Sequence, residues 1–141
     1  RVMGLDYGER RIGVALSDPL GLTAQPLTTV DRTASLDADL ATLRDLARQH
    51  AVVRFVIGLP LGLDGTRGER VRATDRFARR LERVSGIPVE AWDERLTSAQ
   101  AERALLEADL SRRRRRQVID RAAAVLILQS WLDAHSGGAR L

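Results

Sequence analysis

Four acidic side chains from distant parts of the chain stand at positions where they could form one site. Asp6 follows a short apolar run, Asp93 and Glu94 follow another, and Asp120 opens an apolar stretch near the end. Ligands of open α/β sheets bind beyond the carboxyl ends of the strands, so we expect these acids to meet at one edge. Carboxylates gathered there repel one another unless a proton or a cation intervenes. With no cysteine and two histidines in the chain, an oxygen-only ligand set predicts a hard cation, Mg²⁺ or Mn²⁺.

Each acid also has a purely structural interpretation. Asp6 precedes a glycine-bearing turn, where Asp is common, and Asp93 with Glu94 could be a solvated strand end. Asp120 could stabilise the N-terminus of a helix. The combination favours a site, because Asp120 would otherwise lie on the apolar packing face of its own helix.

The elements that must position these acids begin with a β-hairpin. Val2–Leu5 and the alternating run Arg11–Leu16 flank a tight turn that contains Gly8. Pro26–Val30 is a third strand candidate, while Val52–Ile57 and Ile87–Trp92 are apolar runs typical of covered parallel strands.

Helical patterns separate these strands. The apolar spacing predicts a first helix ending near His50 and a second ending at Gly86, the second opened by a Thr66–Glu69 capping box. A second possible capping box, Thr97 with Gln100, opens a helix reaching Asp109, and the last helix covers Val118–Leu132, with the arginine run as an interruption between them. The order β-β-β-α-β-α-β-α-α predicts an α/β fold with a five-stranded mixed sheet, a meander plus parallel strands, flanked by helices.

Length and composition fit one globular domain. The chain has 141 residues, of which 44% are hydrophobic, and we assign 1–135 to the domain and 136–141 to a flexible tail. The absence of cysteine excludes disulfides, thiolate zinc sites and a cysteine nucleophile. The longest apolar run, Ala122–Leu128, is much shorter than the roughly 20 residues that span a bilayer, and no leader opens the chain, so we expect a cytoplasmic protein without a membrane partner.

Basic residues are concentrated in two segments. All 23 basic residues are arginine, and the net charge is only +4. The segment 67–83 contains seven arginines and three acidic residues, and the segment 112–121 contains six arginines and one acidic residue. These segments could be solvated faces of helices. Alternatively, they could bind a polyanion at the edges of a domain whose other residues are acidic on balance.

Four motifs follow one another along nearly the whole chain. They are Leu5-Asp6-Tyr7-Gly8-Glu9-Arg10-Arg11-Ile12-Gly13-Val14-Ala15 with Ser17-Asp18, Gly58-Leu59-Pro60 with Asp64-Gly65-Thr66, Asp93-Glu94-Arg95-Leu96-Thr97, and Asp120-x-x-Ala123-Ala124-Val125-Leu126-Ile127-Leu128-Gln129. In these motifs the chain resembles the YqgF (RuvX) family of Holliday-junction-resolvase-like bacterial proteins, which are assigned to processing the 5′ end of pre-16S ribosomal RNA. The resemblance implies an RNase H-like fold and a nuclease.

The resemblance also implies roles for the acids. Asp6 would be the central metal ligand, Glu94 the strand ligand and Asp120 the helix ligand, with Asp93 as the alternative to Glu94. Related RuvC resolvases carry an acid on the fourth strand and a second acid on the last helix, where this chain has Val56-Ile57-Gly58 and Ala123-Ala124. Two Mg²⁺ or Mn²⁺ ions would activate the attacking water and stabilise the leaving 3′ oxygen, with Asp6 between them.

Substrate contacts are expected around this site. Arg10 and Arg11 follow Asp6 on the turn, and Thr97 and Ser98 stand at a predicted helix start, where N–H groups can bind phosphate. The run Arg112, Arg113, Arg114, Arg115 and Arg116 precedes Asp120 and could contact the nucleic-acid backbone. The glycine-rich stretch Gly58–Gly68 is expected to be a mobile loop over the site.

The leading hypothesis is therefore a metal-dependent endonuclease that acts on pre-rRNA. The alternatives are a Holliday-junction resolvase or general nuclease acting on branched DNA, a non-catalytic RNA-binding factor, and phosphate binding as in sugar kinases. Junction resolution normally needs a two-fold dimer, and the sequence leaves a monomer and a homodimer open.

Overall fold

The strands and helices that the structure describes follow the predicted order. The computed structural model describes residues 1–62, 64–97 and 112–139, with the side chains of 112–120 and 136–139 outside this description. The strands are β1 (Val2–Tyr7), β2 (Arg11–Ser17), β3 (Ala24–Asp31), β4 (Arg54–Leu59) and β5 (Val89–Asp93). The helices are α1 (Leu36–Gln49), α2 (Glu69–Ser85) and α4 (Arg112–Ala139), and a short 3₁₀ turn, η1 (Glu94–Leu96), follows β5.

The sheet is mixed, as the sequence predicts. Its order is β3-β2-β1-β4-β5, with β1–β2 and β2–β3 antiparallel and β1–β4 and β4–β5 parallel. The predicted hairpin is confirmed, and the Gly8 N–H donates to the Arg11 carbonyl at 3.0 Å to close its turn. The carboxyl ends of β1, β4 and β5 therefore lie along one edge of the sheet.

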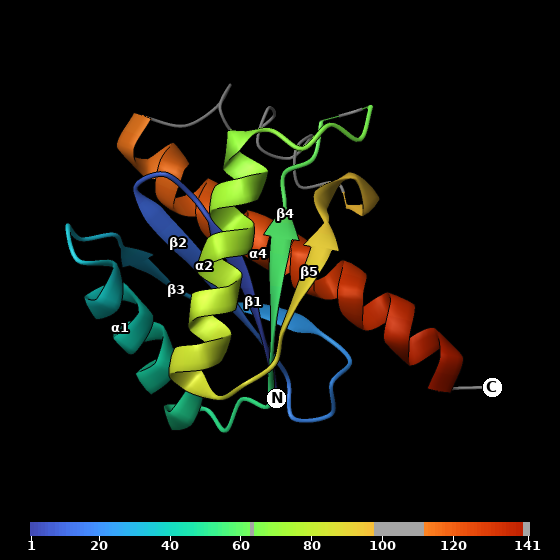
Figure 1. Cartoon of the computed structure of the whole chain (residues 1–141). Helices are drawn as coiled ribbons and strands as arrows, with labels where there is room; N and C mark the ends of the chain where they lie inside the picture. The colour runs from blue at the N-terminus through green and yellow to red at the C-terminus, as the bar shows by residue number, and fades with distance from the viewer. Residues whose placement is uncertain (63, 98–111, 140–141) are drawn as a thin grey trace.

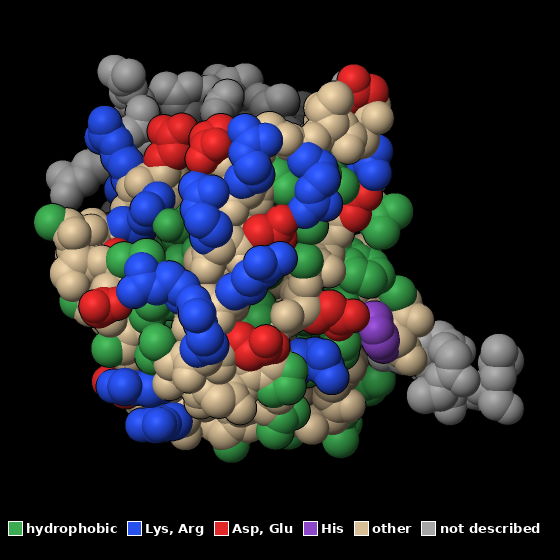
Figure 2. Space-filling model, viewed as in Figure 1, with side chains coloured by type: hydrophobic (Ala, Val, Ile, Leu, Met, Phe, Trp, Pro, Cys, Tyr) green, Lys and Arg blue, Asp and Glu red, His purple; other side chains and the backbone are tan. Residues whose placement is uncertain are grey.

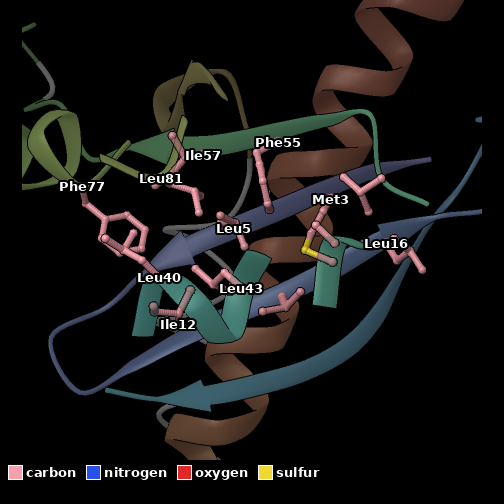
Figure 3. Packing of buried hydrophobic residues seen from close by; sticks show 13 residues of the cluster. Met3, Leu5, Ile12, Leu16, Leu40, Leu43, Phe55, Ile57, Phe77 and Leu81 are labelled. Atoms are coloured by element: carbon pink, nitrogen blue, oxygen red, sulfur yellow. The ribbon is translucent and has the colours of Figure 1, made fainter. Parts of the chain in front are cut away.

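Helices cover both faces of the sheet (Figure 1). Helices α1 and α2 pack on one face over a core that includes Met3, Leu5, Phe55 and Leu81 (Figure 3). On the other face α4 packs over a second core, with Ala15 and Val56 from the sheet and with Ala124, Ile127, Leu128 and Trp131 from the helix. Alternate residues of β1 and β4 thus face different helices, and this alternation decides which face each acid meets.

Helix α4 approaches the sheet most closely at Gly4. A β-carbon at Gly4 would lie 2.6 Å from the Leu128 β-carbon and 3.0 Å from the Ala124 carbonyl oxygen. Only glycine leaves room for the helix backbone here. The middle of α4 is thereby held directly over the middle of β1.

The start of α2 differs from the expectation. The Thr66–Glu69 capping box does not form, because the helix begins after Gly68 and has no side-chain cap. Thr66 instead belongs to the preceding loop, where its N–H donates to Asp64 Oδ1 at 3.1 Å. The predicted end at Gly86 is confirmed, since this residue adopts a left-handed conformation with φ of 71°.

Helix α4 is longer than expected. It begins at Arg112 rather than Val118, so the arginine run does not interrupt the helical backbone but forms its first turns, consistent with the good helix propensity of arginine. It continues through Ala139, and thus through most of the segment assigned to the tail. The helix expected from Thr97 to Asp109 lies outside the described residues. No helix in the described ranges combines the length and apolar character needed to cross a membrane.

Candidate active site

Asp6 lies near the end of the central strand β1 and is almost completely buried, with 5% of its surface exposed. It pairs with Gly13 of β2. Since side chains alternate along a strand, Asp6 faces the same side as Gly4, the side covered by α4.

Glu94 is also buried, with 2% of its surface exposed, and it begins the 3₁₀ turn directly after β5. Its side chain lies over Gly58 of β4: a β-carbon there would be 3.0 Å from Glu94 Cγ and 3.1 Å from Oε1. The register pairs Leu5 with Ile57, so the next residues along these parallel strands, Asp6 and Gly58, are neighbours about 4.8 Å apart. Glu94 and Asp6 therefore occupy adjacent positions on the α4 side of the sheet edge.

Asp93 has a different environment from Glu94. Both of its carboxylate oxygens accept hydrogen bonds from Arg95, with Nη2 to Oδ2 at 2.7 Å and Nε to Oδ1 at 3.1 Å. This pairing holds the pKa of Asp93 below its ordinary value. Asp93 also caps the 3₁₀ turn by accepting from the Arg95 N–H at 2.9 Å. The structure thus separates the two adjacent acids, with Glu94 packed over β4 and Asp93 engaged by an arginine.

Asp120 lies on α4, one helical turn before Ala124, and its side chain is outside the described part of the structure. In Figure 1 the first turns of α4 lie toward the same edge of the sheet as the end of β4. Among the side chains that the structure describes, no three acidic, histidine or cysteine residues gather as a metal site. The three-acid set of Asp6, Glu94 and Asp120 therefore remains a prediction.

The loop between β4 and α2 carries a hydrogen-bonded turn at its tip. The Gly65 N–H donates to the Gly62 carbonyl at 2.8 Å, and the Gly62 N–H donates to the Thr66 carbonyl at 3.1 Å. Hydrogen bonds from Thr66 lower the pKa of Asp64, and the nearby charge of Arg95 adds to this effect. A β-carbon on Gly65 would lie 3.4 Å from Arg95 Nη1, so this arginine lies between the loop tip and Asp93.

The predicted substrate-binding residues are distributed around this edge. Arg10 is exposed on the β1–β2 turn, and Arg11 is half-buried at the start of β2. The hydroxyl and N–H of Thr97 both donate to the Glu94 carbonyl, at 2.9 and 3.1 Å, so in the described residues Thr97 ends the 3₁₀ turn. Ser98 and the side chains of Arg112, Arg113, Arg114, Arg115 and Arg116 are outside the described residues.

Two residues of this edge were missed by the sequence interpretation. Arg95 was treated only as part of a motif, although its spacing from Asp93 is compatible with an ion pair. The sequence interpretation places Gly58 in a loop, but it is the penultimate residue of β4 and makes room for Glu94. No pattern in the sequence marks this second role, because the contact joins β4 to the end of β5.

Comparisons with known proteins agree on a family and a fold. The pattern of the RuvX family, described as "Holliday junction resolvase", matches residues 1–134. A protein of Myxococcus xanthus named "Putative pre-16S rRNA nuclease" is 58% identical over 135 residues, which are 96% of this chain and 89% of that protein. A protein of the same name from Symbiobacterium thermophilum is 57% identical over 136 residues, covering 96% and 94% of the two chains.

Solved structures extend the comparison to the fold. The chain is similar to Thermus thermophilus RuvC in complex with a Holliday junction substrate, with a TM-score of 0.61 and 15% identity over 96% of this chain and 95% of that one. At this identity the likeness shows the fold alone. The predicted RNase H-like α/β architecture is confirmed.

Proposed function

The chain belongs to the RuvX family, and we propose that it is an endonuclease that processes the precursor of 16S ribosomal RNA and depends on Mg²⁺ or Mn²⁺. The observation that carries the metal-dependent part is the placement of two buried carboxylates, Asp6 and Glu94, at adjacent positions of one sheet edge. The ribosomal substrate follows from the names of relatives with more than half of their residues identical.

The residues at this edge fit a hard cation. Asp6 and Glu94 offer oxygen ligands only, and Gly58 between them leaves space for the Glu94 side chain. Asp120, one turn before Ala124 on α4, is the third ligand that we propose. When bound, divalent ions of this kind activate water and neutralise charge on a phosphodiester that is being cut.

The chain's own groups would bind and orient the substrate. Hydrolysis of a phosphodiester needs positioned charge rather than a protein nucleophile, and no histidine or serine is required at the edge. Arg10 is exposed on the turn that follows Asp6, where its guanidinium can bind a backbone phosphate next to the acids. Asp93 holds Arg95 between the strand end and the loop tip, so that Glu94 enters the site from an ordered turn.

A cleavage assay tests this proposal. The wild type and the Asp6→Asn and Glu94→Gln variants are incubated with Mg²⁺ or Mn²⁺ and with single-stranded RNA, single-stranded DNA, duplexes, a four-way DNA junction and a transcript spanning the 5′ end of 16S rRNA. Asp45→Asn is the matched control, because Asp45 is exposed on α1 and pairs only with its neighbour Arg44 among the described residues. Each substitution removes one carboxylate charge and keeps the side-chain shape.

We expect metal-dependent cutting of the precursor transcript by the wild type and by Asp45→Asn, and loss of cutting in both site variants. If the wild type cuts the four-way junction in preference to the transcript, the proposed substrate would be branched DNA and not ribosomal RNA. If Asp6→Asn cuts as well as the wild type, the active site does not include Asp6. If the wild type and all variants bind RNA without cutting it, the non-catalytic RNA-binding factor is favoured.

A further inference from the structure

Helix α2 carries arginines along its outward face. Arg72, Arg76, Arg79 and Arg83, here called the α2 stripe, are all exposed and follow one another at steps of 4, 3 and 4 residues. This spacing keeps them on one side of a helix, opposite the buried Val71, Thr74, Phe77 and Leu81. At a rise of about 1.5 Å per residue the stripe is about 16 Å long.

The acids near the stripe neutralise only its first half. Glu69 accepts from Arg72 at 3.2 Å and from Arg76 at 3.0 Å. Arg79 and Arg83 have no carboxylate within salt-bridge distance in the part of the chain that the structure describes. The second half of the stripe therefore presents an excess of positive charge that no salt bridge holds.

The other acids of this helix are used elsewhere. Asp75 pairs with Arg67, and Arg80 reaches across to Asp37 of α1. Glu82 accepts from the Val89 N–H at 3.0 Å, which ties it to the start of β5. None of these three acids forms a salt bridge with Arg79 or Arg83 in the described residues, although Glu82 lies beside them.

The surface over the stripe is shallow and positive. A hollow of about 510 Å³ is lined by four arginines and one acid: Arg76, Arg79, Arg80, Glu82 and Arg83. Figure 2 shows basic side chains gathered over α2 along its length. A surface of this kind suits a polyanion with repeated charges better than a small molecule, because the hollow is open and its charges are spread along a line.

The stripe leads away from the candidate active site. Helix α2 starts after the loop that follows the carboxyl end of β4, and Arg70 in its first turn lines a small cavity together with Gly8 and Glu9 of the β1–β2 turn. That turn directly follows the strand of Asp6. A strand of nucleic acid that leaves the site past this turn would meet the beginning of the stripe.

We infer that the α2 stripe is a second binding surface for the substrate, which holds the phosphate backbone of double-helical RNA at a distance from the cleavage site. The inference rests on the proposed nuclease function and extends it. Guanidinium groups bind phosphate oxygens through paired N–H donors, and a duplex presents phosphates along the whole length of the stripe. The contact is to the backbone and therefore independent of base sequence.

The test compares Arg79→Gln/Arg83→Gln with the wild type and with Arg44→Gln/Arg48→Gln, a pair on α1 that removes the same charge away from the stripe. Binding is measured in EDTA at several salt concentrations with a 24-base-pair RNA hairpin that has a single-stranded extension. Cleavage of an 8-nucleotide single-stranded RNA, which lacks the double helix that the stripe is inferred to hold, is measured in parallel. Circular dichroism checks the fold of each variant, and Arg79→Lys/Arg83→Lys restores the charge.

We expect the Arg79→Gln/Arg83→Gln variant to reduce the slope of log affinity against log salt by about 2 and to weaken hairpin binding about ten-fold at 0.15 M salt. The Lys variant should recover most of the slope, and the α1 pair should keep it. Cleavage of the short RNA should stay unchanged.

Unchanged hairpin binding by Arg79→Gln/Arg83→Gln, or an equal loss in the α1 pair, would overturn the inference. Loss of binding to a polyglutamate peptide with retained hairpin binding would overturn it too and assign the stripe to an acidic protein. The outcome is independent of the proposed cleavage activity: a stripe that binds RNA in a protein that never cuts would refute only the nuclease, and cutting without a contribution from the stripe would refute only this inference.

Discussion

Glu94 and Gly58 pack against each other across the ends of two neighbouring strands, so that a β-carbon on Gly58 would lie 3.0 Å from Glu94 Cγ. Because Gly58 has no side chain, the buried carboxylate of Glu94 can lie directly over β4. The contact explains why the residue next to Asp6 on the adjacent strand is a glycine.

Substituting Gly58→Ala should impair cleavage more than folding. The new β-carbon would come 2.5 Å from Ile127 Cδ1, the mobile end of a side chain, and would push Glu94 away from the sheet edge. We expect a loss of stability of about 1–3 kcal/mol and a loss of kcat of about ten-fold or more. Urea unfolding and the cleavage assay measure the two effects.

Gly68→Ala is the matched control for this substitution, because a β-carbon on Gly68 would meet nothing within 4 Å. It should cost no more than about 1 kcal/mol and leave cleavage unchanged. A Gly58→Ala enzyme with full activity would show that the position of Glu94 is not critical.

The two adjacent acids should differ in their importance for catalysis. Glu94→Gln should reduce kcat about a hundred-fold or more, because it removes a proposed metal ligand. Asp93→Asn should reduce it less than about ten-fold, since it weakens only the hydrogen bonds to Arg95. Single-turnover cleavage at saturating Mn²⁺ separates the two, and the reverse order of effects would make Asp93 the strand ligand.

Substituting Gly4→Ala should destabilise the whole domain. The added β-carbon would meet the Leu128 β-carbon at 2.6 Å and the Ala124 carbonyl oxygen at 3.0 Å, neither of which can turn away. We expect a loss of about 2–3 kcal/mol, in the upper part of the range expected for Gly58→Ala. Denaturant unfolding at pH 7 provides the comparison, and a stable Gly4→Ala protein would contradict the close contact between β1 and α4.

Stability should decrease in acid partly through Asp18. Its Oδ1 accepts from the N–H groups of Leu22 at 2.7 Å and Thr23 at 3.0 Å, and the bond from Thr23 contributes most to a pKa below the ordinary value of 3.8. A carboxyl with a lowered pKa in the folded state stabilises fully above its unfolded pKa, and this contribution is lost as the pH falls through the folded value. The free energy of unfolding should therefore drop below about pH 4.

Asp18→Asn isolates this contribution. The amide oxygen still accepts hydrogen bonds but does not titrate, so the variant should show a shallower decrease between pH 4 and pH 2. Urea unfolding across this range measures both proteins. Parallel curves for the variant and the wild type would show that Asp18 does not contribute to the acid sensitivity.

Local patterns were sufficient for most of the fold. Alternating and continuous apolar runs identified all five strands and their mixed arrangement. This was possible because the apolar pattern of each strand reflects which of its faces are buried. Helix boundaries were less well predicted. Thr66 has the right type and spacing for a cap, but it bonds to Asp64 in the loop, and the helix begins after Gly68 instead.

The candidate site shows where the sequence alone was sufficient and where the tertiary structure was needed. The sequence by itself determined which acids stand at strand ends, since a polar residue that ends an apolar run is a local feature. Only the tertiary structure separated Glu94 from Asp93, because strand register and the 3₁₀ turn direct one carboxylate to Gly58 and the other to Arg95. Adjacent side chains diverge from a strand, and the face that each one meets depends on residues far away in the chain.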